Sequence, residues 1–478
     1  MNLASFSFLA FIAATIVAFH LSASIGYRRF VLTSANIVFI ASYVDSLEQV
    51  LPLLGFLLVG YASLQLVYLQ RTAIALAASI AVVLLVYVFL KRFSFVESFA
   101  QLPFPYLIVG ISYILFRLLH LMVDASSGDL PYRIRPLAFF RYTCNFLCFV
   151  SGPIQRYEDF ANMDGVEVVP LDATSVYVAF SRIVSGYLKF VVIAAAANYI
   201  FINFTPQLAA SLSLAKICLV YAVCAAAYTA YLYFNFSGYM DIVIGVGMLF
   251  GQILPENFDK PFSARSFLEF WQRWHMTLSE WFKLYVFNPF LMFLMTHFTS
   301  PGLTAYLGVL AFFVTFLIMG VWHGTTLVFV IYGLLMGAGA SINKLWQIFC
   351  VNKFGKKRYG SISRKAGYVY FARGLTFSYF AIALTCLWKP ELPQFLDLSR
   401  QLGVSGICGA FALLAGGFAL AVLILDTAWT WIRSKAGVAK ALLDKMAIRN
   451  MWLAGRILAI LIISSLFNAS PDFVYKAF

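Results

Sequence analysis

The sequence predicts an all-α protein that crosses a membrane many times, and three observations support this class. The chain has 478 residues, of which 62% are hydrophobic and only 11% are charged, and its mean hydropathy is +0.86. Apolar runs of about 20 residues, long enough to cross a bilayer, recur along it. No polar stretch between these runs is long enough to form a soluble core. We therefore expect one membrane-embedded domain over residues 1–478, not a soluble helical protein.

The apolar runs predict roughly ten to twelve spanning helices. They lie near residues 3–22, 32–45, 50–69, 73–90, 104–123, 178–204, 212–235, 302–320, 324–342, 374–388, 403–425 and 452–468. The first run lacks the positive region of a secretory signal, so we expect a retained helix. We expect scaffold helices over residues 1–125, a motif-bearing core over 131–342 and C-terminal helices over 343–478.

The net charge of +14 is explained by short basic loops between spans and does not indicate nucleic-acid binding. Residues 352–373 carry seven basic side chains and no acidic one, and 433–450 are similarly basic. Both segments are expected to be cytoplasmic and to contact anionic lipid headgroups. The mixed-charge loop from Lys389 to Arg400 then lies on the other face. The N-terminus and the C-terminal FVYKAF are expected to face outward.

Residues 131–160 interrupt the pattern of spans with prolines and arginines. The segment is too short to cross comfortably, so we expect a re-entrant or interfacial segment. Irregular backbone at membrane depth needs protein or a water-filled cavity to satisfy its polar groups. Ser151, Gly152 and Pro153 are therefore predicted to line a cavity, although a helix break at the surface would also explain them.

Two further segments combine apolar and charged residues. Asp241 lies within an apolar run, which indicates either a functional carboxylate or a buried partner such as an arginine. Residues 265–290 mix Arg, Glu, His and Lys with aromatic residues outside any good span. An amphipathic helix in the membrane interface would explain this mixture.

Three of the five histidines have ordinary settings. His20 and His120 lie on apolar helices and are expected to be hydrogen-bonded core residues, and His297 is expected to end a helix. Cys144 and Cys148 could share a helix face. No second pair of ligands lies near them, so we expect buried thiols and no metal site.

His323 and His275 have unusual settings. His323 stands between Gly320 and Gly324 in a stretch with no charged residue from 302 to 342. An imidazole at membrane depth is a functional hypothesis by default, and the glycines would let backbone or a substrate approach it. Burial would keep the imidazole neutral and able to accept a proton from a hydroxyl, as a general base does. His275 lies in WQRWH on the interfacial segment.

Several segments resemble motifs of bacterial membrane-bound O-acyltransferases. They are FWQRWHMTLSEWF around His275, VWHG at His323, SGPIQRYEDF, YFNFSGYMDIVIGVGMLFGQILPENFDKPF, ISYILFRLLHLMVDASSG and the C-terminal FVYKAF. That family includes proteins of alginate and peptidoglycan acetylation and of teichoic acid D-alanylation. The resemblance runs, with gaps, from about residue 26 to the end.

The resemblance implies a ring of tilted helices around a central funnel, with His323 as the essential histidine and His275 as a second site residue. It implies transfer of an activated acyl group, supplied from the cytoplasm, to a hydroxyl. Further residues are expected to bind substrate or line the cavity: Trp322, Arg156, Pro153, Ser237, Asp241, Asn257 and Trp274. This chain has Lys283-Leu284-Tyr285 where the family often has Arg-Asp-Tyr, which puts any role of that acid in doubt.

The donor implied is acetyl-CoA or a carrier-protein thioester, with no bound cofactor and no metal. We expect acetylation of an exported polysaccharide or cell-envelope polymer in the bacterial inner membrane, with D-alanyl transfer as the alternative. The expected partners are membrane lipids, a separate extracytoplasmic acyltransferase or polysaccharide synthesis and export proteins, and in the D-alanyl case an acyl carrier protein.

Two rivals of another class remain, a transporter with His323 and Asp241 in a proton relay and a catalytically silent scaffold. No internal repeat supports the transporter. About 30 Å of helix would separate His323 from Lys344, at the start of the basic loop, so His323 is expected in the outer half of the membrane.

Overall fold

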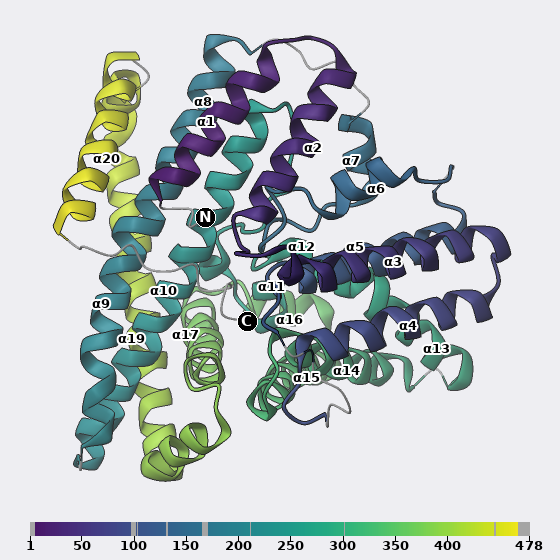
Figure 1. The fold of residues 1–478 in the computed structure, drawn as a ribbon. Coiled ribbons are helices and arrows are strands. Elements are labelled where there is room, and N and C mark those ends of the chain that lie inside the picture. The colour runs from purple at the N-terminus through teal and green to yellow at the C-terminus, as the bar shows by residue number, and fades with distance from the viewer. Residues whose placement is uncertain are drawn as a thin grey trace. The chain divides into compact units, whose positions relative to one another are not determined.

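The fold is described from a computed structural model of the chain, drawn in Figure 1. The structure describes residues 5–96, 102, 104–130, 132–164, 171–210, 212–300, 302–443 and 446–466. These residues form helices joined by short connections, and the only β pairing among them is an isolated bridge between Phe258 and Trp274. The all-α class is therefore confirmed. The predicted outward position of FVYKAF lies outside the described residues.

Within the described ranges, nine helical segments are long and apolar enough to cross a membrane, which makes this chain a multi-pass membrane protein. They are Leu47–Gln70, Ala73–Lys91, Ala173–Ala209, Leu214–Leu249, Thr304–His323, Leu327–Phe354, Ala366–Trp388, Leu392–Ala428 and Ile448–Ser465. Helix α1 (Phe6–His20) is apolar but shorter. The runs predicted near 32–45 and 104–123 fall on α2 (Ile25–Ala41) and α5 (Ile111–Ser127). Both helices have 17 residues and are not among the nine, because part of each predicted run is irregular backbone.

The chain divides into two compact units, each described here by itself. The first contains the described residues up to Tyr187 together with Gly238–Glu256. Besides α1, α2 and α5, its helices are α3 (Leu51–Gln70), α4 (Ala73–Lys91), α6 (Pro136–Thr143), α7 (Tyr157–Asp164), α8 (Ala173–Tyr187) and the end of α10 (Leu214–Leu249). The expected ring, funnel and single domain stay predictions.

The segment predicted to be re-entrant contains α6, and only the backbone between α6 and α7 is irregular and mostly buried. Arg117 on α5 donates hydrogen bonds to the carbonyl oxygens of Tyr142, Thr143 and Cys148, at 3.0, 2.7 and 2.9 Å. These bonds satisfy backbone acceptors that no helix or strand pairs. The buried guanidinium therefore fixes the course of this segment.

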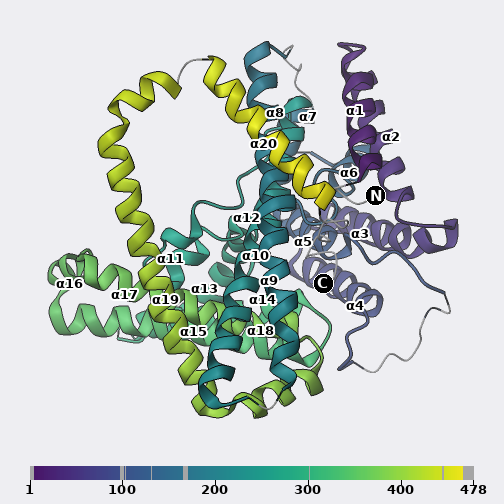
Figure 2. The ribbon, with the colours of Figure 1, turned by 90° about the vertical axis from the view of Figure 1, so that its left-hand side faces the viewer.

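The second unit contains Leu188–Ser237 and the described residues from Asn257 onward. Its further helices are α9 (Ala194–Phe204), α11 (Phe267–Trp271), α12 (Met276–Phe282), α13 (Asn288–His297), α14 (Thr304–His323), α15 (Leu327–Phe354), α16 (Lys356–Ile362), α17 (Ala366–Ala383), α18 (Thr385–Trp388), α19 (Leu392–Leu443) and α20 (Met446–Leu466). Figure 2 shows the long course of α19 from α18 to α20. A non-helical residue, Gly403, interrupts α19.

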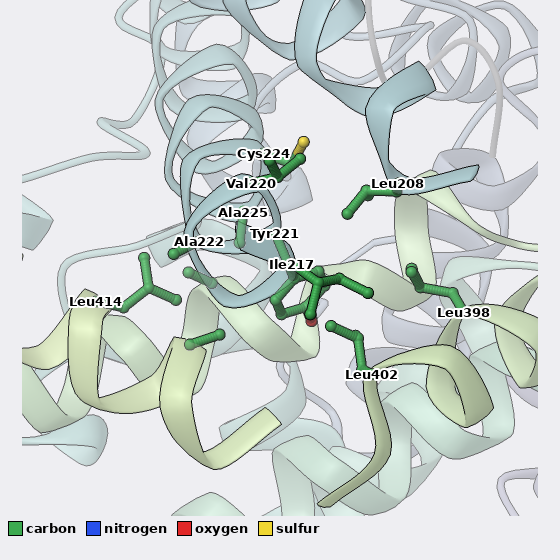
Figure 3. Close-up of a cluster of buried hydrophobic side chains, with 12 residues drawn as sticks. Leu208, Ile217, Val220, Tyr221, Ala222, Cys224, Ala225, Leu398, Leu402 and Leu414 are labelled. Carbon is green, nitrogen blue, oxygen red and sulfur yellow. The ribbon is translucent and has the colours of Figure 1, made fainter. Parts of the chain in front are cut away.

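Part of the second unit's core lies where α10 meets the start of α19 (Figure 3). Ile217, Tyr221 and Ala225 follow one face of α10 and pack with Leu398 and Leu402. The Tyr221 hydroxyl is bonded to that of Thr385 on α18, at 2.7 Å. This bond satisfies two polar groups that would be costly to bury alone.

Helices α14 and α15 form a closely packed antiparallel hairpin. Small residues allow close approach: a Cβ on Gly320 would lie 2.2 Å from the Cα of Gly333. Further along, the Ser341 hydroxyl donates to the carbonyl of Val309 at 3.2 Å. The contacts place the end of α14 that carries His323 beside the start of α15.

Two expectations about helices are corrected. Residues 265–290 are not one interfacial helix, because α11 ends at Trp271 and α12 begins at Met276, with a π-helical turn before α13. The basic residues 352–373 are mostly helical, since α15 continues to Phe354 and α16 and α17 follow. Their polar composition reflects exposure and not a break in secondary structure.

Candidate functional site

His323 is the last residue of α14 and is buried, with 5% of its surface exposed. Its imidazole packs edge-on against the rings of Trp322 and Tyr332, with ring centroids 4.8 and 5.6 Å away. Trp322 is also buried. The sequence therefore places an imidazole, and no charged side chain, at the end of an apolar helix with aromatic walls.

The glycines beside His323 serve helix packing. A Cβ on Gly320 would collide with the backbone of Gly333, and one on Gly324 would lie 2.1 Å from the ring of Phe329. Of the two roles expected for these glycines, close approach of backbone is confirmed at Gly320. At Gly324 the approaching group is a side chain of the same unit.

His275 occupies the turn between α11 and α12, with φ 44° and ψ 53°. This left-handed conformation costs a non-glycine residue roughly 1–2 kcal/mol, and such residues cluster at functional sites. Two backbone bonds hold the turn: Met276 N donates to the Asn257 carbonyl at 2.9 Å, and Asp259 N donates to the Arg273 carbonyl at 3.0 Å. The segment after α10 therefore forces the chain direction at His275.

The amide of Asn257 fixes the proton position on His275. Its Oδ1 accepts hydrogen bonds from Thr277 N at 3.1 Å and Thr277 Oγ1 at 2.9 Å, which identifies this atom as the oxygen. The same oxygen lies 3.2 Å from His275 Nδ1. Because an amide oxygen only accepts, Nδ1 must carry the proton. In the neutral ring, Nε2 then holds the lone pair and can accept a proton or a hydrogen bond.

The two histidines interact electrostatically. Burial holds the pKa of His275 well below its ordinary value of 6.5, and the charge that His323 would carry lowers it further. His275 is 1% exposed, so a charged imidazole there would lose most of its hydration. The structure thus brings together two histidines that are far apart in the sequence, and His275 is neutral at physiological pH.

An aromatic cluster surrounds His275. The Phe236 ring packs edge-on at 4.9 Å between centroids, and Trp274 packs against Phe258 and Phe270 at 5.1 and 5.3 Å. Next to Phe236, the buried Ser237 hydroxyl has no hydrogen-bond partner within the described part of the chain. Asn257, Trp274 and Ser237 therefore belong to the histidine-bearing unit, as does Trp322.

Three other residues expected at the site lie in the first unit. Arg156 has a half-exposed side chain 3.7 Å from a carboxylate oxygen of Asp124, and Pro153 is buried in the irregular segment. Asp241 lies 3.2 Å from the guanidinium of Arg182. Of the two readings of Asp241, an arginine partner is therefore present, although both side chains are only partly buried; a functional role of Asp241 stays a prediction.

The remaining polar candidates have structural partners. His20 Nε2 lies 2.9 Å from the Leu249 carbonyl, and His120 Nε2 lies 2.8 Å from the Tyr142 hydroxyl. His297 ends α13, as expected. Cys144 and Cys148 are buried free thiols. Across the described residues, no group of three or more His, Cys, Asp or Glu side chains could hold a metal ion.

Three contributors to the site were not predicted. Thr277, Phe236 and Tyr332 contact Asn257, His275 and His323 respectively. Thr277 carried a weak signal, since it follows His275 by two residues at the start of a helix. The departure Lys283-Leu284-Tyr285 lies in the π-helical turn, where Lys283 pairs with Glu280 at 3.1 Å.

Together, the spanning helices define a multi-pass membrane protein, and two buried histidines lie in its second unit. The sequence profile of MBOAT, the membrane-bound O-acyltransferase family, matches residues 37–382, so the chain belongs to this family. Curated relatives include a teichoic acid D-alanyltransferase of Bacillus subtilis, 34% identical over 47% of this chain and 56% of the relative.

Two further relatives come from other bacteria. A probable alginate O-acetylase of Pseudomonas fluorescens is 30% identical over 49% of this chain and 44% of its own length. A teichoic acid D-alanyltransferase of Streptococcus thermophilus is 32% identical over 52% and 60% of the two chains. The chain therefore matches about half the length of these relatives.

Proposed function

We propose that the protein transfers an acyl group, preferentially acetyl, from a thioester donor on the cytoplasmic side to hydroxyls of an extracytoplasmic polysaccharide or envelope polymer. The observation that carries the proposal is the pair of buried imidazoles in one unit of a membrane-bound O-acyltransferase. The donor is acetyl-CoA, and the setting is the bacterial inner membrane.

His323 is the general base of this reaction. Its imidazole takes the proton from the acceptor hydroxyl while that oxygen attacks the thioester carbonyl. The tetrahedral intermediate then collapses, the carbon–sulfur bond breaks, and the imidazolium returns the proton to the leaving thiolate. Such acid–base catalysis contributes a factor of roughly 10² to 10⁴ in rate. His275 presents the lone pair of Nε2 as a hydrogen-bond acceptor that orients the hydroxyl.

The remaining expected residues have supporting roles in the proposal. Arg156 is suited to the negative groups of the donor, because its guanidinium can bind a phosphate through two hydrogen bonds, and Pro153 shapes the adjacent segment. Trp322, Trp274 and Ser237 line the acceptor path. The partners in this proposal are a separate extracytoplasmic acyltransferase or the proteins that synthesise and export the polymer.

His323→Ala tests the function directly. Membranes containing the variant should transfer no label from radioactive acetyl-CoA to polymer, whereas the wild-type protein should. The variant should still fold, since one imidazole contributes proton transfer and little packing area. Equal transfer by a well-folded variant would contradict the proposal. His297→Ala, which removes an exposed histidine at a helix end, is the matched control.

D-alanyl transfer is the second candidate, because two of the relatives described above are teichoic acid D-alanyltransferases. Labelled D-alanyl carrier protein in place of labelled acetyl-CoA distinguishes the two. Label that enters polymer only from the carrier protein would identify D-alanine as the acyl group and an acyl carrier protein as a partner. A transporter would instead move solute with neither donor present.

A further inference from the structure

A cavity of 710 Å³ lies in the second unit, apart from the histidines. Residues of α11, α15, α16, α17 and α19 line it. On α15 the lining begins at Gly339, roughly 18 Å of helix beyond Leu327 and so far from the end of the hairpin that carries His323. The catalytic proposal does not use this cavity.

The walls of the cavity are apolar and aromatic. Trp346 and Phe371 both line it and are 48% and 64% exposed. The Trp346 indole donates to the Tyr368 hydroxyl at 3.2 Å, and that hydroxyl lies 3.3 Å from the hydroxyl of Tyr359. Tryptophan and tyrosine favour the level of the lipid headgroups, so these side chains are suited to a membrane surface.

The lining also carries an excess of positive charge. It includes Arg265, Arg364 and one acidic residue, Glu269. Glu269 already pairs with Arg265 at 3.4 Å and with Arg273 at 3.2 Å. Arg364 has no carboxylate within 4.0 Å in the described ranges. It follows α16, which begins with Lys356, Lys357 and Arg358, and it precedes Lys365.

We propose that the cavity binds an anionic membrane phospholipid. One acyl chain lies along the aromatic wall, and the phosphate is bound by Arg364, with Arg265 beside it. Cavities of several hundred Å³ hold ligands of this scale, and an arginine fork matches a phosphate. The charge excess selects an anionic lipid over a zwitterionic one. The proposal does not depend on acyl transfer.

Quenching of Trp346 fluorescence tests the site. The full-length protein is placed in phosphatidylcholine nanodiscs with increasing amounts of phosphatidylglycerol whose acyl chains are brominated. The Trp346 signal is the difference between wild type and Trp346→Phe. Brominated phosphatidylglycerol should quench this signal at lower content than brominated phosphatidylcholine.

Two variants separate the parts of the site. Arg364→Gln should raise the phosphatidylglycerol content needed for half-quenching about fivefold, the effect of roughly 1 kcal/mol per cation near a lipid surface. Gly360→Leu should lower maximal quenching. It adds a side chain at a lining position where a new Cβ would have no atom within 4 Å.

Lys357→Gln is the matched control, because it removes a charge from the neighbouring exposed helix α16 without altering the cavity lining. If Lys357→Gln raised the phosphatidylglycerol content needed for half-quenching as much as Arg364→Gln does, the attraction would be diffuse. This result would overturn the proposal. Equal quenching by the two brominated lipids would also overturn it. Relief of quenching by acetyl-CoA would assign the cavity to an acyl donor instead.

Discussion

At the residue scale, the Asn257 amide connects backbone geometry to histidine chemistry. Its oxygen accepts from the Thr277 backbone, the Thr277 hydroxyl and His275 Nδ1. The same residue therefore holds the strained turn and selects the tautomer of His275. This double role explains why a neutral carbonyl oxygen suits the position, since a donor in its place would leave Nδ1–H unsatisfied.

Replacing Asn257 should separate structure from chemistry. Asn257→Ala leaves buried donors without an acceptor, at about 1–3 kcal/mol each, so unfolding in detergent should occur at lower temperature and acyl transfer should fall. Asn257→Asp keeps the acceptor but adds a negative charge that raises the pKa of His275. As the pH is lowered, the transfer activity of this variant should therefore begin to fall at a higher pH than the wild-type activity does. Asn203→Ala, on an exposed amide of α9, should change neither property.

The buried His275 also predicts a pH dependence of stability. Its pKa is held well below 6.5 in the folded protein by burial and by His323. In the unfolded chain it titrates near 6.5, so the unfolded state binds more protons below that pH. The contribution of His275 to the free energy of unfolding is therefore complete above pH 6.5. It is lost as the pH falls below this value, by up to about 1.4 kcal/mol for each pH unit.

Thermal unfolding of purified protein in detergent, measured between neutral and mildly acidic pH, checks this dependence. His275→Gln should lose stability less steeply below pH 6.5 than the wild type. His297→Gln changes an exposed histidine and should follow the wild type. Parallel curves for His275→Gln and the wild type would show that folding does not lower the pKa of His275.

At the element scale, the α14–α15 hairpin positions His323 through close backbone contact. Gly320→Ala should be destabilising by about 1–3 kcal/mol, because its methyl group would meet the Gly333 backbone at 2.2 Å and overpacking costs this much. Displacement of the end of α14 should also lower acyl transfer. Gly308→Ala is a control on the same helix, where a new Cβ meets no atom within 4 Å. If Gly308→Ala lost as much stability and acyl transfer as Gly320→Ala, the contact between Gly320 and the Gly333 backbone would not explain the effect.

The sequence predicted the helices well where composition alone determines them. The apolar runs near 73–90 and 302–320 became α4 and α14 with nearly the same bounds. Between residues 265 and 290 the local pattern suits one amphipathic helix, yet the structure breaks it at His275. The cause is the long-range bond from Met276 to Asn257, which no local periodicity records.

The candidate site shows the same division. His323 could be selected from the sequence because its imidazole contrasts with its apolar neighbours, whereas His275 was selected mainly through the family resemblance. Their electrostatic interaction could not be predicted from the sequence. The two residues lie on different elements, and neither local sequence determines the distance between them. The shared acceptor at Asn257 was expected only as a lining residue, because the tautomer depends on atomic distances.

At the scale of the whole molecule, charge and helix direction together predict an orientation. The positive-inside rule places the basic end of α15 and helix α16 in the cytoplasm. Because α14 and α15 are antiparallel, His323 lies at the opposite end of the hairpin. The Thr326 hydroxyl there is bonded to the carbonyl of Pro390, within the mixed-charge segment. That segment is expected on the outer face.

Cysteine labelling in intact cells tests this orientation. In a Cys408→Ser background, which removes the exposed native thiol, Glu391→Cys should react with a membrane-impermeant maleimide added outside. Ser361→Cys on α16 should react only after the membrane is opened; both positions are exposed.

This pattern would place His323 in the outer half of the membrane, because α15 is about 42 Å long and its basic end is cytoplasmic. An acyl group loaded from inside must then pass through the protein, while a polymer can approach from outside. Labelling of Ser361→Cys from outside would show that the protein has the opposite orientation, with His323 near the cytoplasmic face. Acyl transfer would then be confined to acceptors on the inner side.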